Sequence, residues 1–214
     1  MSKPVSRALL VIIGIVAGVV IAGIIYTAMG YSIFSGEKEP ETPDKNENAQ
    51  LIELAYSIVE SIRDGDYAAL SEAAHPEFGV VFSPYATIVL KPNQCFFAEQ
   101  IAAFETDTSL YMWGKYIDSG EPIDMTVADY FAEFVFDRDY SAAPIIGVNH
   151  IIRRGNALEN IKEVFPNAIF VEFHIPGCEK DGAEEFDWST LRLGFEEYEG
   201  GLKLTLILHS EGAV

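Results

Sequence analysis

Residues 190–209 read TLRLGFEEYEGGLKLTLILH, and this stretch decides what kind of fold the chain can form. Strand-favouring residues fill Thr190–Tyr198 and Leu202–His209, with Gly200 and Gly201 between them. Glycine adopts the left-handed backbone of tight hairpin turns without steric cost, so the two segments are expected to pair as an antiparallel hairpin. A third strand is predicted over Ala168–Ile175. The last part of the chain therefore forms an antiparallel sheet.

Side chains alternate between the two faces of a strand, and this pattern predicts which face is buried. Apolar side chains share one face: Ile169, Val171, Phe173, Ile175, Leu202, Leu204, Leu206 and Leu208. The opposite face carries Phe170, Glu172, His174, Lys203, Thr205, Ile207 and His209. We expect the first face to form the core and the second to be solvated or covered by a partner. The alternative is a metal or acid–base site that uses the histidines of the second face.

Helical signals precede this sheet. Apolar residues recur at helical spacing from Leu51 to Ile62, and Tyr67–Ala74 predicts a second short helix. Gly79–Leu90 is rich in β-branched and aromatic residues and predicts an extended segment, with Pro84 at an edge or a bulge. Leu110–Ile117 predicts a further strand. Helices early and antiparallel strands late indicate the α+β class.

Two further segments complete the predicted domain. Thr126 and Asp129 have the spacing of a capping box that begins a helix, and residues 145–152 fit either an extended or a helical segment. Residues 50–214 are then a single α+β domain with early helices and a curved antiparallel sheet. Its element order is that of the NTF2-like cone fold, which is an analogy.

An uncharged apolar stretch, ALLVIIGIVAGVVIAGIIYTAM, occupies Ala8–Met29. As a helix it is long enough to cross a bilayer core of about 30 Å. Lys3 and Arg7 precede it, so residues 1–7 are predicted to be cytoplasmic and the residues after it extracytoplasmic. Residues 30–49 are predicted to form a disordered acidic stalk. A cleaved signal peptide is the alternative, but its apolar region would be shorter.

Small residues repeat every fourth position in this stretch, at Gly14, Gly18 and Ala22. Such a stripe lets helix backbones approach closely in a membrane. The sequence therefore raises the hypothesis of a homodimer formed through the transmembrane helix.

The charge of the chain limits its partners. The formal net charge is −19, and all 33 acidic residues follow Gly36. A strongly negative field repels nucleic acid and anionic headgroups, so we expect no nucleic-acid partner. Cationic partners, metal ions and cell-envelope polycations are compatible with it, and so is a role of the acidity in solubility alone.

Four sequence blocks resemble a family of uncharacterised bacterial exported proteins and lipoproteins. They are HPEFGVVFSPYA (75–86), WGKYIDSGEPIDMT (113–126), RGNALENIKEVFPNAIFVEFHIPG (154–177) and DWSTLRLGFEEYEG (187–200). The chain departs from the family in having an apolar helix where many relatives carry a lipid-modified cysteine, and in lacking their Trp-rich final strand. The resemblance implies export and a single domain, and it carries over no catalytic residue.

Standard catalytic and nucleotide-binding signatures are absent from the sequence, and the four histidines have no metal-site spacing. A pocket between the helices and the concave side of the sheet is expected, and its candidate ligand-binding lining is His75, Ser83, Tyr85 and Trp113. The alternative assigns His75 to a helix end, Ser83 to a bulge and both aromatic rings to the core.

Cys95 and Cys178 are the only thiols, and export would permit a disulfide between them, with two free thiols as the alternative. We expect no cofactor and assign no catalytic residue. The leading hypothesis is a membrane-anchored extracytoplasmic domain that binds a small ligand, an envelope component or a protein. The second is an NTF2-like hydrolase or isomerase with a pocket His–carboxylate pair.

Overall fold

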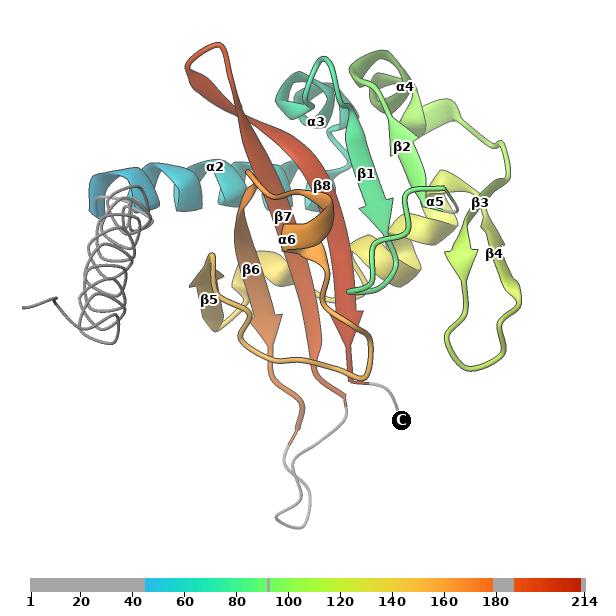
Figure 1. Cartoon of the computed structure of the whole chain (residues 1–214). Helices are drawn as coiled ribbons and strands as arrows, with labels where there is room; N and C mark the ends of the chain where they lie inside the picture. Colours follow the sequence, from blue (N-terminus) through green and yellow to red (C-terminus); the bar gives the residue numbers. More distant parts are fainter. Residues whose placement is uncertain (1–44, 92, 179–186, 213–214) are drawn as a thin grey trace, which may run out of the picture. The chain divides into compact units, whose positions relative to one another are not determined.

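The computed structural model describes residues 45–91, 93–178 and 187–212 (Figure 1). The chain divides into two compact units at Pro43 and Asp44, and the described residues all belong to the second. The predicted membrane segment Ala8–Met29, its small residues Gly14, Gly18 and Ala22, and residues 30–44 of the predicted stalk lie outside the described ranges. Within those ranges, no helix has the length and apolar character that a membrane crossing needs.

Six strands form a curved, mixed sheet in the order β2-β1-β8-β7-β6-β5 (Figure 1). Their bounds are Val80–Ser83 (β1), Gln94–Phe96 (β2), Ile145–Val148 (β5), Ile169–Ile175 (β6), Ser189–Tyr198 (β7) and Gly201–Glu211 (β8). All neighbouring pairs are antiparallel except β1 and β8, which run parallel. The α+β class and the three C-terminal strands are confirmed. The prediction of a wholly antiparallel sheet is wrong, because β1 runs parallel to β8 and makes the sheet mixed.

The hairpin between β7 and β8 has the predicted turn but an unpredicted irregularity. Glu199 and Gly200 have positive φ angles of 50° and 81°, as a tight two-residue turn requires. Gly194 pairs with Leu206 whereas Phe195 pairs with Leu204, so Thr205 has no partner of its own and forms a bulge. The bulge reverses the side-chain alternation along β8, which makes the prediction of one leucine face wrong.

Both faces of the sheet are covered. On the main face, Leu204 and Ile207 belong to a large core with α2 and the aromatic residues of the central segments. On the other face, Leu206 and Leu208 form a second core, against which residues 149–165 pack; in Figure 1 this segment and its short helix α6, Ile161–Val164, cross in front of the strands. The expectation that one face is solvated is therefore wrong.

The first helix of the described residues, α2, spans Lys45–Asp64 and lies across the main face (Figure 1). It begins before Leu51, so residues 45–49, which were predicted as the end of the stalk, are helical. No glycine or proline interrupts this span, and Leu51 and Ala55 are buried in the core. The predicted second helix is confirmed as α3, Tyr67–Ala73, where the Asp66 side chain accepts a hydrogen bond from the Ala69 N–H.

The remaining elements connect the sheet's first and second halves. They are α4 (Ala98–Ala102), 3-10 turns at Phe104–Thr106 and Tyr140–Ala142, β3 (Tyr111–Lys115), β4 (Pro122–Met125), α5 (Val127–Tyr130) and a π-helical turn at Phe131–Val135. Strands β3 and β4 form a separate two-stranded ribbon. The predicted cap is confirmed, because Thr126 Oγ1 accepts from the Asp129 N–H at 3.2 Å.

Candidate binding cleft

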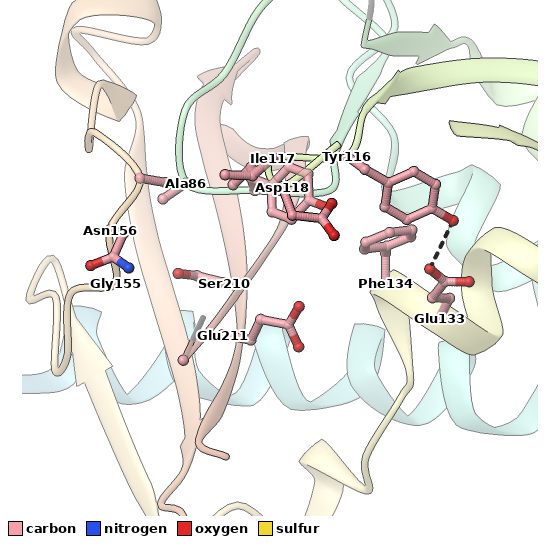
Figure 2. A pocket seen from close by; sticks show the side chains of 13 residues that line it. Ala86, Tyr116, Ile117, Asp118, Glu133, Phe134, Gly155, Asn156, Ser210 and Glu211 are labelled. Atoms are coloured by element: carbon pink, nitrogen blue, oxygen red, sulfur yellow. Dashed lines mark hydrogen bonds between the residues drawn. The ribbon is translucent and has the colours of Figure 1, made fainter. Parts of the chain in front are cut away.

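A cleft of about 670 Å³ opens beside the end of β8 (Figure 2). Five segments that are distant in the sequence line it: Tyr85 and Ala86, Tyr116–Asp118, Glu133 and Phe134, Gly155–Ala157, and Ser210–Gly212. Three of these segments meet near the C-terminal end of strand β8: the β3–β4 connection, the π-helical turn and the segment before α6. Clefts of this size, assembled between elements, are typical ligand sites.

Three carboxylates dominate the polar lining of the cleft. Asp118, Glu133 and Glu211 come from separate segments and turn toward the same open space (Figure 2). Among the described lining residues there is no Lys, Arg or His, and none of the ion pairs of the described residues includes these three acids. The cleft therefore concentrates negative charge that no ion pair among the described residues neutralises.

Aromatic rings form the apolar part of the lining. Phe134 lies between two tyrosines, with ring centroids 5.8 Å from Tyr85 and 6.4 Å from Tyr116. The Tyr116 hydroxyl donates to Glu133 Oε1 at 3.2 Å (Figure 2). Burial, with the nearby charge of Glu211, raises the pKa of Tyr85 to about 12. The rings of Tyr85, Tyr116 and Phe134 thus form an aromatic wall of the cleft.

A buried ion-pair cluster lies on the face of the sheet that carries the second core. Arg192 on β7 donates to Glu159 Oε2 at 2.7 Å and to Glu172 Oε2 at 2.9 Å. Its guanidinium also stacks over the Phe170 ring at 5.2 Å. Although burial disfavours the charged form, the bonds and charges of the two glutamates raise the pKa of Arg192. Neither Glu172 nor the Arg192 side chain is exposed, so this cluster is structural.

A second polar cluster lies behind Phe134. His209 packs its ring against Phe134 at 5.8 Å, and its Nε2 lies 3.1 Å from Ser189 Oγ and 3.5 Å from Asp137 Oδ1. Ser189 and Tyr140 each donate to Asp137, at 3.0 and 2.6 Å. Burial favours a higher pKa for Asp137, but the hydrogen bonds from His209, Tyr140 and Ser189 prevail and lower it.

This cluster lacks the geometry of a hydrolytic triad. In such a triad the serine and the carboxylate bind opposite nitrogens of the histidine. Here both approach Nε2, while Nδ1 lies 3.3 Å from the Pro84 carbonyl oxygen. Ser189 and His209 are each only 1% exposed. A substrate carbonyl has no path to the Ser189 hydroxyl.

Of the four residues proposed from sequence as a pocket lining, only Tyr85 borders this cleft. Tyr85 lines the cleft, whereas Ser83 donates to the Tyr85 carbonyl oxygen at 2.8 Å from inside the fold. Trp113 stacks on Tyr130 in the main core, with centroids 3.8 Å apart. His75 stacks on Phe78 and its Nδ1 accepts from the Phe78 N–H at 3.1 Å, which is the helix-end role that was the alternative.

The two strand histidines do not share a face. His209 pairs with Leu191 and faces the main core. His174 pairs with Thr190 and contacts Trp188 on the opposite face. Both are buried, which corrects the expectation of a solvated histidine face. The Thr205 bulge is the reason, because it changes which residues of β8 point to each side. The described residues contain no group of three or more His, Cys, Asp or Glu side chains placed to hold a metal ion.

Cys95 and Cys178 are both free thiols. Cys95 lies on β2 and Cys178 just after β6, and these strands are four positions apart in the sheet. At about 4.8 Å per strand the separation is roughly 19 Å, far beyond disulfide reach. The fold therefore keeps the two thiols apart.

Comparison with known proteins adds no relative: the chain matches no protein-family model, no curated protein and no solved structure. The cleft is therefore interpreted from its own chemistry. Sequence reasoning had not selected Asp118, Glu133 or Glu211. The only signal of them was the general excess of acidic residues, which left cationic partners open.

Proposed function

We propose that the domain binds an organic cation, an amine or ammonium group on an organic scaffold, in the cleft beside β8. The observation that carries the proposal is the convergence of Asp118, Glu133 and Glu211 on a hollow walled by Tyr85, Tyr116 and Phe134. Carboxylates attract a cation by charge, and aromatic faces attract it through their quadrupoles. The two kinds of group together favour an organic cation over a neutral ligand.

The shape of the cleft supports an organic cation rather than a bare metal ion. Its volume of about 670 Å³ is that of a small-molecule site, and apolar side chains occupy much of the wall. A metal ion would need three or more oxygen or nitrogen ligands converging at bonding distance. No such group exists among the described residues.

The proposal can be tested with choline and its neutral isostere 3,3-dimethylbutan-1-ol, titrated into the full chain by calorimetry. Choline should bind and the neutral alcohol should bind more weakly, and added salt should weaken only choline. Glu211→Gln should lower choline affinity about fivefold, which corresponds to about 1 kcal/mol. The exposed Glu197→Gln is the matched control. Equal affinity for the two probes would refute the proposal.

The second candidate is a hydrolase or isomerase that uses His209 with Asp137 as acid and base. It is favoured by the distance of 3.5 Å between His209 Nε2 and Asp137 Oδ1, and by the contact of His209 with Phe134 of the cleft. The burial of His209 and the placement of its Nδ1 on Pro84 weigh against it. Two results together would refute the hydrolase or isomerase and leave cation binding as the proposed role. They are unchanged choline binding by His209→Asn, and no turnover of ester or epoxide probes by the unmodified chain.

We propose in addition that the domain is NTF2-like and is held outside a membrane by Ala8–Met29. Support comes from the length of that apolar stretch, from Lys3 and Arg7 before it, and from the resemblance to exported proteins. External protease added to intact cells should release a fragment that contains residues 50–214. Protection of that fragment until lysis would reverse the proposed orientation.

A further inference from the structure

One wall of the cleft is a segment without regular secondary structure, residues 152–160 between β5 and α6. It contributes Gly155, Asn156 and Ala157 to the lining, opposite Asp118 and Phe134 (Figure 2). A segment of this kind would ordinarily be mobile, because it has no helical or sheet hydrogen bonds of its own. A cleft with a mobile wall would not keep a fixed shape around its carboxylates.

The buried cluster of Arg192 fastens this segment at both ends. At its start, the Ile152 N–H donates to Glu172 Oε1 at 2.9 Å, while the other oxygen of Glu172 is bound by Arg192. Near its end, Glu159 accepts from both terminal nitrogens of Arg192, at 2.7 and 3.2 Å. One guanidinium therefore links the two ends of the wall to the central strand β7.

Neighbouring bonds reinforce the second attachment. The Thr87 hydroxyl donates to the Leu158 carbonyl oxygen at 2.8 Å. The Asn160 side chain accepts from the Ile88 N–H at 2.8 Å and donates to the Ile88 carbonyl oxygen at 2.9 Å. The segment is thus held from β7 on one side and from the chain after β1 on the other.

The middle of the segment lies directly on β8, and Gly155 makes this approach feasible. A Cβ atom at position 155 would lie 2.9 Å from the carbonyl oxygen of Glu211 and 3.5 Å from the Trp188 ring. The first distance is shorter than real Cβ contacts, and the obstacle is backbone, which cannot swing away. Only glycine lets the wall meet the strand that carries the cleft carboxylate Glu211.

We infer that Arg192 and Gly155 are positioning residues for the cleft: Arg192 fixes both ends of the wall through Glu159 and Glu172, and Gly155 seats its middle against Glu211. Neither residue needs to touch the ligand. The inference rests on the proposed function for what the cleft binds, whereas how the wall is held is a property of the fold and can be tested separately.

The first test compares Gly155→Ala with Gly201→Ala in the full chain. The nearest atom to a Cβ at Gly201 is 3.9 Å away, so that variant changes a glycine without a clash. Gly155→Ala should speed amide hydrogen exchange in residues 153–158 about tenfold while β6, β7 and β8 keep their protection. It should also reduce the ratio of choline affinity to 3,3-dimethylbutan-1-ol affinity by about fivefold. Gly201→Ala should change neither quantity.

The second test uses Glu159→Gln, because removal of Arg192 itself is expected to weaken the whole fold. The variant keeps the size of the side chain but removes the charge from one end of the wall, so exchange should rise first in residues 157–160. Unchanged exchange in both variants would overturn the positioning role. Faster exchange with an unchanged choline ratio would overturn its link to the ligand. If the unmodified chain discriminates neither probe, the proposed function fails and the exchange result alone decides how the wall is held.

Discussion

The domain contains two groups of carboxylates that the fold treats in opposite ways. Glu159 and Glu172 are withdrawn from water and share one guanidinium, that of Arg192. Asp118, Glu133 and Glu211 border an open cleft, and the described residues offer them no ion-pair partner. The wall segment, residues 152–160, connects the two groups, because it carries Glu159 and also contributes Gly155, Asn156 and Ala157 to the cleft.

The difference separates charge that maintains the structure from charge that is available to a ligand. A buried acid needs a cation and hydrogen bonds, because desolvation of an uncompensated charge is costly. Acids at an open cleft stay hydrated, and their mutual repulsion is relieved only when a cation arrives.

The largest effect is expected from Arg192→Met. It leaves Glu159 and Glu172 buried without a cation, which should lower the free energy of unfolding by about 3–5 kcal/mol. Urea denaturation followed by circular dichroism measures the loss. The matched variant Glu211→Gln should leave that free energy unchanged or raise it slightly. A loss below about 1 kcal/mol for Arg192→Met would contradict a structural role for the cluster.

The next effect concerns the cleft as a whole. Joint replacement of Asp118, Glu133 and Glu211 by their amides should lower choline affinity roughly 100-fold, at about 1 kcal/mol for each charge. Stability should be unchanged or higher, because repulsion among the three acids is removed. A control chain carries amides at exposed acids elsewhere: Glu60, Glu99 and Glu197. Equal losses of affinity in the two chains would mean that the effect is one of net charge only.

Asp137 provides an intermediate case: hydroxyl groups and His209 surround it, and the Arg138 guanidinium approaches it only at 3.8 Å from a partly exposed position. Its pKa is lowered from the ordinary value of 3.8, so its contribution to stability is present above that pH and is lost as the pH falls through the lowered pKa. Asp137→Asn should cost about 1–3 kcal/mol at pH 7. In this variant the free energy of unfolding, measured between pH 2 and 7, should also fall less steeply as the pH decreases. If the free energy of unfolding of Asp137→Asn fell in acid as steeply as that of the unmodified chain, Asp137 would not be the source of this pH dependence.

The smallest effect is expected from Tyr116→Phe. The ring that borders the cleft remains, and only the hydroxyl that donates to Glu133 is lost. Choline affinity should fall by less than about threefold, consistent with a net hydrogen-bond contribution near 0.5 kcal/mol. Calorimetry on this variant beside Tyr85→Phe measures the change. A tenfold loss would show that the hydroxyl itself orients the ligand.

Local patterns in the sequence predicted most strands and helices but not how their faces combine. Alternation located β6, and Gly200 located the hairpin, because both depend on neighbouring residues. The Thr205 bulge has no local signature, and it moved His209 to the face opposite His174. Burial of that opposite face depends on residues 149–165, which are distant in the sequence from β8.

The cleft was beyond sequence reasoning for the same reason. Its three carboxylates come from a ribbon connection, a π-helical turn and a strand end, which only the folded chain brings together. The sequence pattern proposes Tyr85 and Ser83 for the same pocket lining. Because the chain changes direction after β1, Tyr85 lies in the cleft and Ser83 lies inside the fold. Composition indicated acidity, but it could not separate the acids that Arg192 neutralises from those left open.

The place of β8 in the sheet also determines the order in which the chain can fold. Val81 on β1 pairs with Leu206, and Leu193 on β7 pairs with Ile207, so β8 alone joins the two halves of the sheet. During synthesis, β1 and β2 lack their sheet neighbour β8 until more than a hundred further residues have been made, because β8 begins only at Gly201. Contacts so distant along the chain form slowly and leave strand edges exposed meanwhile. Assembly of this domain is therefore a late, concerted event, and a chain that stalls before β8 offers quality-control proteases two open sheet edges.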